Sequence, residues 1–235
     1  MTSLDSPAVA DSLVAYVRGQ LGSSTFFSDL RAGKPTLEQL RTVFGQYYLW
    51  RNQFHRWFGV CIAKSAPFGT AFDTSFVLAE LAEHIDEEVG GDHHGMCVAF
   101  LAQLGITDPS AIMPTPETTQ YSDSFVVAYM NPERSGEEAL AALAGREIVA
   151  PARNRLTIDA LSQHYGISSG LEFFDLHEEL EIEHFKGLWG ALVKTYSADA
   201  ELLIKAARTE IRRHVEFWDV VYGRHLCDVD AVAAR

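Results

Sequence analysis

Cysteines are scarce in this sequence and long apolar runs are absent, and each deficit excludes a class of protein. Three cysteines occur in 235 residues, Cys61, Cys97 and Cys227, without a CxxC pair or a disulfide-like spacing. Such cysteine usage suits a reducing compartment. No run of about 18 apolar residues could span a bilayer. The first residues lack a basic segment followed by an apolar core, so we expect no signal peptide and a cytoplasmic location.

Basic residues are also in deficit. The 19 lysines and arginines face 32 aspartates and glutamates, which gives a formal charge of −13. We therefore expect no nucleic acid and no anionic membrane as a partner. Bound metal can neutralise part of this charge, because carboxylates are metal ligands. The 47% hydrophobic and 11% aromatic content indicates a folded globular chain.

Helical periodicity dominates the sequence, and no alternating strand pattern is convincing. We predict a single all-α domain over residues 1–235, with flexible ends at about 1–7 and 227–235. The domain is expected to contain about seven helices, at 8–21, 37–64, 72–104, 117–130, 136–164, 169–194 and 198–225.

Several helix ends carry specific signals. The segments Thr36–Gln39 and Ser135–Glu138 match capping boxes, and Pro116 suits a first helical turn. Gly105 and Gly166 stand where a left-handed cap ends a helix.

The stretch FFDLHEELEIEHFK at 173–186 places metal-ligating residues where an apolar stripe should be. At about 100° per residue, His177, Glu181 and His184 share one arc with Phe173 and Leu188. The acids Asp175, Glu179 and Glu183 lie on the opposite, solvated arc. A buried histidine–glutamate network would explain one such pair, but three convergent ligands favour a metal, since a buried carboxylate is costly without a partner.

A second group occurs in the segment 72–104. Glu87 and His94 are seven residues apart, so they stack on one helical face. His93 points about 120° away and His84 lies one turn before Glu87, so we prefer His94. A kink at Gly90 and Gly91 would change this phase and could bring either His93 or His94 inward, so the choice between them stays open, with His84 as a weaker candidate.

A lone carboxylate, Glu147, lies on an apolar stripe of the segment 136–164. Pro151, four residues later, cannot donate to the carbonyl of Glu147, so we expect the helix to bend or loosen there. Arg146 or Arg153 is an alternative partner for this carboxylate.

Together these motifs supply three histidines and three carboxylates from three helices. The expected metal ligands are Glu87, His94, Glu147, His177, Glu181 and His184. Imidazole and carboxylate without thiolate suit iron or manganese better than structural zinc. Six ligands suit two bridged ions better than one catalytic ion with open positions.

This pattern resembles the heme-oxygenase-like diiron oxidases and oxygenases, iron-containing redox enzymes related in fold to heme oxygenase and to thiaminase-type helical proteins. Their pattern is E-x6-H, a glutamate on a later helix, then H-x3-[DE]-x2-H. The chain matches it from about residue 40 to residue 220, and the HYG at 164–166 is also typical of the wider superfamily. A ferritin-like bundle is a weaker match, because only one E-x-x-H motif is present.

The resemblance implies a heme-oxygenase-like helical bundle that binds two iron ions and no heme. It implies an O₂-dependent oxidase or oxygenase that acts on a small organic acid, such as an amino acid or fatty acid, by oxidative C–C cleavage, desaturation or N-oxidation. An external electron donor and a homodimer stay open. The alternatives are a metal-free thiaminase-like or cofactor-synthesis-like enzyme of the same fold, and a non-enzymatic metal-binding protein.

Other polar residues are expected around the centre. Glu80, Glu83 and Asn154 are candidates to hydrogen-bond the ligand histidines from outside. The aromatic stretch 44–59 is a candidate substrate wall, and its candidate substrate-binding residues are Tyr48, Arg51, His55 and Arg56. An arginine there would clamp a carboxylate. His214 and His225 are interpreted as surface residues.

Overall fold

The computed structural model describes residues 4–65, 75–196 and 199–233, with side chains described as far as residue 223. All regular elements in these ranges are helical, which confirms the all-α prediction. The helices are α1 (Pro7–Ser23), α2 (Thr25–Arg31), α3 (Leu37–Arg51), α4 (Phe54–Lys64), α5 (Ser75–Gly90), α6 (His93–Gln103), the 3₁₀ turn η1 (Pro109–Ala111), α7 (Pro116–Tyr129), α8 (Gly136–Glu147), α9 (Ala150–Tyr165), α10 (Glu172–Thr195) and α11 (Ala200–Ala233).

The expected number of about seven helices is wrong, because three predicted helices are each divided in two. The division of 136–164 falls before Pro151, which lacks the N–H that would continue α8 into α9. The division of 72–104 falls at Gly90–Gly91, where Asp92 adopts a left-handed conformation (φ 53°). Helix α2 was missed because its seven residues are too few for a periodic pattern.

The predicted end signals are confirmed. Both capping boxes form, with Thr36 and Ser135 as the N-cap residues of α3 and α8. Pro116 begins α7. Gly105 and Gly166 have φ values of 81° and 67°, the left-handed conformation that glycine adopts without a steric penalty.

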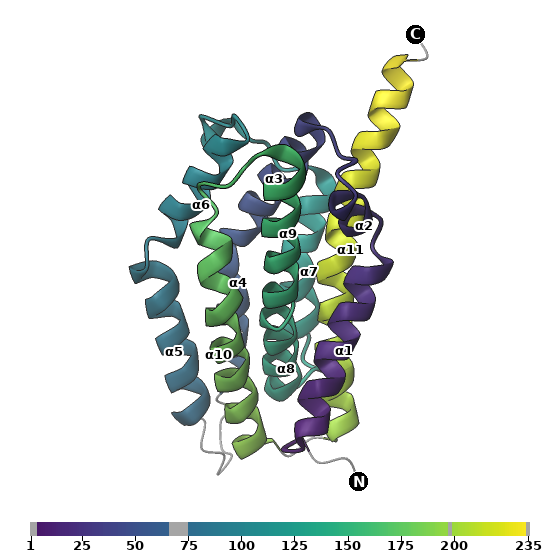
Figure 1. Cartoon of the computed structure of the whole chain (residues 1–235). Helices are drawn as coiled ribbons and strands as arrows, with labels where there is room; N and C mark the ends of the chain where they lie inside the picture. The colour runs from purple at the N-terminus through teal and green to yellow at the C-terminus, as the bar shows by residue number, and fades with distance from the viewer. Residues whose placement is uncertain (1–3, 66–74, 197–198, 234–235) are drawn as a thin grey trace.

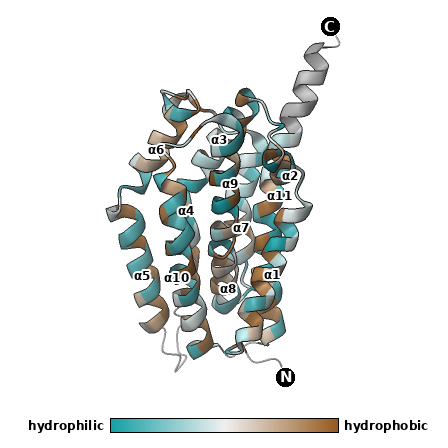
Figure 2. Cartoon of the chain, in the orientation of Figure 1, coloured by the Kyte–Doolittle hydropathy of each residue, from teal (hydrophilic) through white to brown (hydrophobic). Residues whose placement is uncertain are grey.

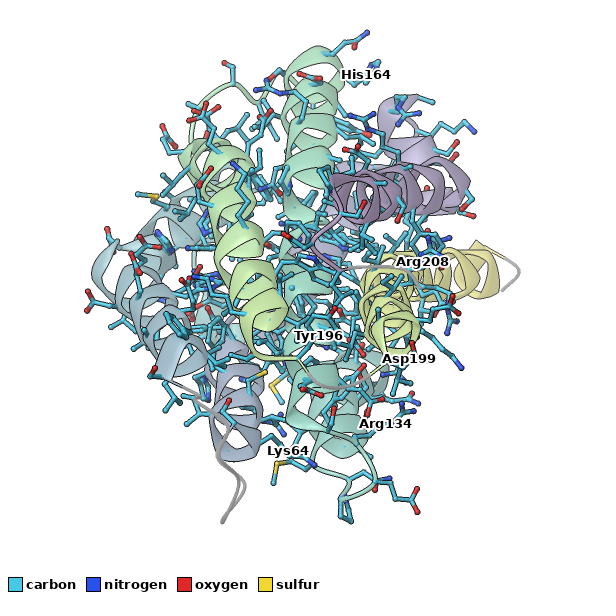
Figure 3. All side chains as sticks on the ribbon, turned by 90° about the horizontal axis from the view of Figure 1, so that it is seen from below. Lys64, Arg134, His164, Tyr196, Asp199 and Arg208 are labelled. Carbon is cyan, nitrogen blue, oxygen red and sulfur yellow. The ribbon has the colours of Figure 1, made fainter. Side chains whose placement is uncertain are left out.

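The long helices run along a common axis, with α5, α10, α9 and α11 visible from one edge of the bundle to the other (Figure 1). Helix α11 packs on α8, and α10 packs on α5, α8 and α9. Each helix carries both hydrophobic and hydrophilic residues, as amphipathic bundle helices do (Figure 2). Seen along the axis, side chains fill the space between the helices, and labelled residues such as His164 and Arg134 lie at the periphery (Figure 3).

An aromatic cluster forms the core between α2, α3, α10 and α11. Trp218 stacks on Tyr47, with ring centroids 4.8 Å apart, and on Phe26 at 5.6 Å. Phe173 and Phe174, which precede the ligand-bearing turns of α10, are buried in the same cluster. The beginning of α10 is therefore anchored by aromatic packing, which fixes the direction of the side chains that follow.

The two chain ends were predicted to be flexible. At the first, Leu4 is buried, and its carbonyl accepts a hydrogen bond from the Trp189 indole at 3.3 Å. At the second, α11 continues to Ala233. Among the described residues, the hydrophobic segments of the helices are too short or too polar to cross a bilayer.

Candidate metal centre

Helix α10 directs His177, Glu181 and His184 into the interior, as the helical arc predicts. All three side chains are buried. The acids on the opposite arc, Asp175, Glu179 and Glu183, are exposed. Three core positions of α10 are therefore occupied by residues that are strong metal ligands.

Four residues converge at the turn of α10 that carries Glu181 and His184, and we refer to them as the Glu147 cluster: His84, Glu147, Glu181 and His184. They come from α5, α8 and α10, and one ligand atom of each lies within 4.8 Å of the others. The rings of His84 and His184 stack at a centroid distance of 3.4 Å. Nδ1 of His184 lies 3.0 Å from Oε2 of Glu181.

Three residues from α5, α6 and α10 converge about one turn away, and we refer to them as the Glu88 cluster: Glu88, His93 and His177. Oε2 of Glu88 lies 3.3 Å from Nδ1 of His93, and Oε1 lies 3.5 Å from Nε2 of His177. His84 and Glu88 are one turn apart on α5, as Glu181 and His177 are on α10. The two clusters are therefore neighbours, about 5–6 Å apart along the helices.

Glu87 and His94, two of the expected ligands, lie outside both clusters. His94 is exposed, and its nearest aromatic contact is Tyr48, at a centroid distance of 5.8 Å. Glu87 is half exposed, and its Oε2 lies 2.7 Å from Nε2 of His184. The two residues would stack only on one continuous helix, but α5 ends at Gly90 and α6 starts at His93 in a new phase. The structure places Glu88 and His93 inward instead, and His84 beside them.

Three of the four histidines in the clusters, His84, His93 and His177, have a buried ring nitrogen without a hydrogen-bond partner, whereas both ring nitrogens of His184 face carboxylates. His177 donates from Nδ1 to the backbone carbonyl of Phe173 at 2.6 Å, and this hydrogen bond selects the tautomer with its lone pair on Nε2. This Nε2 is buried without a hydrogen-bond partner, as are Nδ1 of His84 and Nδ1 of His93. Unpartnered buried imidazole nitrogens that point at carboxylates are the arrangement expected of a metal-binding set.

The carboxylates also match a cation. Burial raises the pKa of Glu147 well above its usual range, and the adjacent Glu181 raises it further. Burial opposes ionisation of Glu88, but His177, His93 and Arg51 outweigh it and lower the pKa of Glu88 well below its usual range. Burial lowers the pKa of His84 to about 4, so this ring is neutral and able to ligate at pH 7. The seven N and O donors, without a thiolate, fit iron or manganese.

The residues expected to hydrogen-bond the ligand histidines, Glu80, Glu83 and Asn154, have other surroundings in the structure. The amide oxygen of Asn154 accepts from Nε and Nη2 of Arg153, at 3.0 and 2.8 Å. The carboxylate of Glu80 lies over Gly187 of α10, where an added Cβ would collide with it. Glu83 is exposed. The partner that orients His177 is instead a backbone carbonyl, which the sequence does not reveal.

Of the four expected substrate residues, Arg51 alone lines the cavity beside the clusters. Nη2 of Arg51 lies 2.6 Å from Oε2 of Glu88. Tyr48 is buried near His94, and His55 is exposed. Arg56 pairs with Asp123 at 2.7 Å on the surface. The interleaved basic residues of 44–59 therefore point in different directions.

The cavity has a volume of about 50 Å³, and its wall combines ligands, aromatic residues and arginines. Glu88, Glu147, His177 and Glu181 face it from one set of helices. His214 also lines it and is buried, so the prediction that His214 lies on the surface is wrong. His214 lies on the buried face of α11 together with Glu210 and Trp218. The many charged residues of that helix obscure the periodicity that would identify this face from the sequence. The side chain of His225 lies outside the described residues.

Solved structures with a similar fold include three that cover most of the chain. The first is a TenA homologue from P. horikoshii, with 18% identity and a TM-score of 0.67, covering 91% of this chain and 98% of that one. A CADD-like protein of unknown function from Nostoc punctiforme has 19% identity and a TM-score of 0.70, covering 92% and 96%. A domain of unknown function from Shewanella denitrificans, described as having a heme oxygenase-like fold, has 15% identity and a TM-score of 0.72, covering 93% and 92%.

These likenesses define the class: the chain has a heme-oxygenase-like fold, as predicted. A search of curated proteins finds no significant match. The family model described as "iron-containing redox enzyme" matches residues 41–219. The chain therefore belongs to the family of iron-containing redox enzymes, and the family prediction is confirmed.

Proposed function

We propose that the protein is a non-heme diiron, O₂-dependent oxidase or oxygenase that acts on a small organic acid. The observation that supports this proposal is the pair of neighbouring clusters, which lie about one helical turn apart and together offer seven N and O donors. One cluster would suit a mononuclear site, whereas two adjoining clusters suit two ions. Family membership supports iron over manganese.

The proposed ligands follow the clusters. Glu88, His93 and His177 would hold one ion, and His84, Glu147, Glu181 and His184 would hold the other. Glu87 would act as a hydrogen-bond acceptor for His184 from the half-exposed rim. When bound, the ferrous pair would supply the electrons that reduce dioxygen, a task for which protein side chains are poorly suited.

The chain itself orients, shields and balances charge. The carbonyl of Phe173 fixes the His177 ring, and Arg51 holds Glu88 by an ion pair. Tyr47, Trp50 and Phe173 line the cavity and keep bulk water from the ligands. Burial raises the pKa of Tyr47 to about 12, so its phenol keeps its proton.

The reaction subtype follows from the substrate, and oxidative C–C cleavage, desaturation and N-oxidation of an amino acid or fatty acid are the proposed alternatives. Incorporation of one oxygen atom into the substrate with reduction of the other to water requires two electrons besides those of the substrate. An external electron donor is the proposed source in that case.

A metal-free thiaminase-like enzyme is the second candidate, because TenA homologues have the same fold. That alternative would require another group to do the chemistry, and Cys97 on α6 is the cysteine nearest in sequence to the ligands of α5 and α6. Cys97 is buried, and burial raises the pKa of its thiol to about 12. A thiol in this state is a poor nucleophile, which favours the metal-dependent function.

The proposal is tested by iron bound per chain after anaerobic loading with ferrous ion. We expect about two equivalents for the native protein and a clear loss for His177→Ala. His164→Ala is the matched control, because His164 lies at the periphery, where its Nε2 donates to the carbonyl of Arg31 (Figure 3). Oxygen uptake with a panel of carboxylic acids then tests the reaction. Little iron in the native protein would exclude the diiron function and favour the metal-free one.

A further inference from the structure

Three arginines line the cavity beside the clusters, and they differ in their partners. Arg51 pairs with Glu88. Arg146 donates from Nε and Nη2 to Oε2 of Glu210, at 3.2 and 3.0 Å. Arg153, which is 3% exposed, forms no ion pair with a carboxylate of the described residues. A buried guanidinium without an anion is unfavourable unless a ligand neutralises it.

The existing partners of Arg153 hold the side chain but do not neutralise it. Its Nε and Nη2 donate to the amide oxygen of Asn154, and its Nη1 donates to Nε2 of His214 at 2.9 Å. His214 is neutral, because burial and the two neighbouring arginines lower its pKa well below the usual range. The guanidinium also lies 5.1 Å from the ring centroid of Tyr47. These contacts use three of the five N–H groups that an arginine offers.

The wall of the cavity holds further unpartnered donors. Nη1 of Arg146, Nε1 of Trp50, Nε1 of Trp57 and Nδ1 of His214 are buried without hydrogen-bond partners. All four residues line the cavity. Since Nε2 of His214 accepts from Arg153, its Nδ1 carries the proton and is a donor too. Apart from the ligand histidines, the unpartnered polar atoms of this wall are therefore N–H donors, which an anion would satisfy.

We propose that Arg153, assisted by Nη1 of Arg146, anchors the carboxylate of a short monocarboxylic substrate in this cavity. The proposal rests on the proposed function, because Glu147 and Glu181 line the same cavity and would hold a metal beside the bound acid. The volume of about 50 Å³ corresponds to about three to five water molecules, which suits a short carbon chain. Arg51, one of the two arginines that the sequence analysis names as substrate-binding candidates, is already neutralised by Glu88.

The test is calorimetric titration of propionate into the full chain, with and without anaerobic ferrous loading. We expect binding to be about 10- to 100-fold weaker in Arg153→Gln, the loss expected when charge-assisted hydrogen bonds are removed. Arg155→Gln is the matched control, since Arg155 lies two residues away on α9 and is half exposed, where it pairs with Glu178. The control is expected to bind propionate like the native protein.

A comparison on the unaltered protein covers the case in which Arg153→Gln does not fold. Propionamide has the shape of propionate without its charge, so we expect it to bind at least 10-fold more weakly. Equal binding of both compounds, equal binding of propionate to the native protein and to folded Arg153→Gln, or no binding of propionate to the native protein would overturn the anchor.

Iron content separates this proposal from the proposed function. If iron binds but propionate binding does not depend on Arg153, the anchor is wrong and the metal centre stands. If propionate binding depends on Arg153 but the chain takes up no iron, the anchor stands and the diiron function is wrong.

Discussion

Replacing either of two adjacent histidines distinguishes the structural assignment of the metal centre from the sequence motif. His93 is 3% exposed and faces Glu88 and His177, whereas His94 is exposed beside Tyr48. We predict that His93→Ala loses one of the two iron equivalents and that His94→Ala keeps both. The substitutions are chemically identical and one residue apart, so the comparison tests the direction in which each imidazole points.

The structure sets the expected magnitude. His93 is one of three donors in the Glu88 cluster, so its removal leaves a site with two protein ligands. Losing even an outer hydrogen-bond partner of a metal ligand weakens affinity by about 10- to 100-fold. Loss of a direct ligand should cost at least that much, or about 1.4–2.7 kcal/mol of binding free energy. Replacement of the exposed His94 should leave iron affinity unchanged and should alter the free energy of unfolding by less than about 0.5 kcal/mol.

The assay is competition for ferrous ion against a coloured chelator under anaerobic conditions, followed by measurement of retained iron. The reasoning would be refuted if His94→Ala lost iron while His93→Ala retained it. That result would mean that α5 and α6 join into one helix in the iron-bound protein, which would bring Glu87 and His94 onto one face.

Three further predictions follow from the structure. In the iron-free protein the pKa of Glu147 is raised, so the folded state keeps a proton that the unfolded chain releases above about pH 4.5. The free energy of unfolding should therefore fall as the pH rises from about 4.5 through the folded-state pKa. Urea titrations at several pH values should show a flatter pH dependence for Glu147→Gln. Excess ferrous ion at about 100 times its dissociation constant should stabilise the native fold by about 2.7 kcal/mol for each occupied site, visible as a higher melting temperature that chelator reverses. Gly145→Ala should destabilise the chain by about 1–3 kcal/mol, because the new Cβ would lie 2.5 Å from the carbonyl oxygen of Ala207. Gly19→Ala, whose new Cβ would have nothing within 4 Å, should stabilise α1 by about 0.5–1 kcal/mol. Equal melting temperatures of the two variants would contradict the packing argument.

Local signals predict the fold well wherever a helix has a specific start or end. The capping boxes at Thr36 and Ser135 and the cap at Gly166 fix three helix termini correctly. The interruption between α3 and α4, at Asn52 and Gln53, contains neither glycine nor proline, so no helix-breaking residue predicts it. Periodicity alone reads such a pair of helices as one.

The same reasoning explains which ligands the sequence reveals. His177, Glu181 and His184 lie on one uninterrupted helix, where the 3.6-residue period relates their directions, and all three are buried as expected. Across Gly90 and Gly91 that relation is lost, so the choice between His93 and His94 depends on the angle between two helices. The pairing of Arg51 with Glu88 joins residues 37 positions apart, and no periodic pattern contains it.

Charge balance connects the metal centre to the proposed carboxylate anchor. In the iron-free protein, Glu88 is balanced by Arg51. Burial opposes protonation of His184, but Glu181 and Glu87 outweigh it and raise the pKa of His184, so this ring can carry the charge that balances Glu181. Glu147 avoids its own charge by holding a proton. Ligation requires Glu147 and His184 to release their protons, so iron affinity should rise with pH. The positive charge of Arg153 is left without a counterpart in either state, and a substrate carboxylate would supply it.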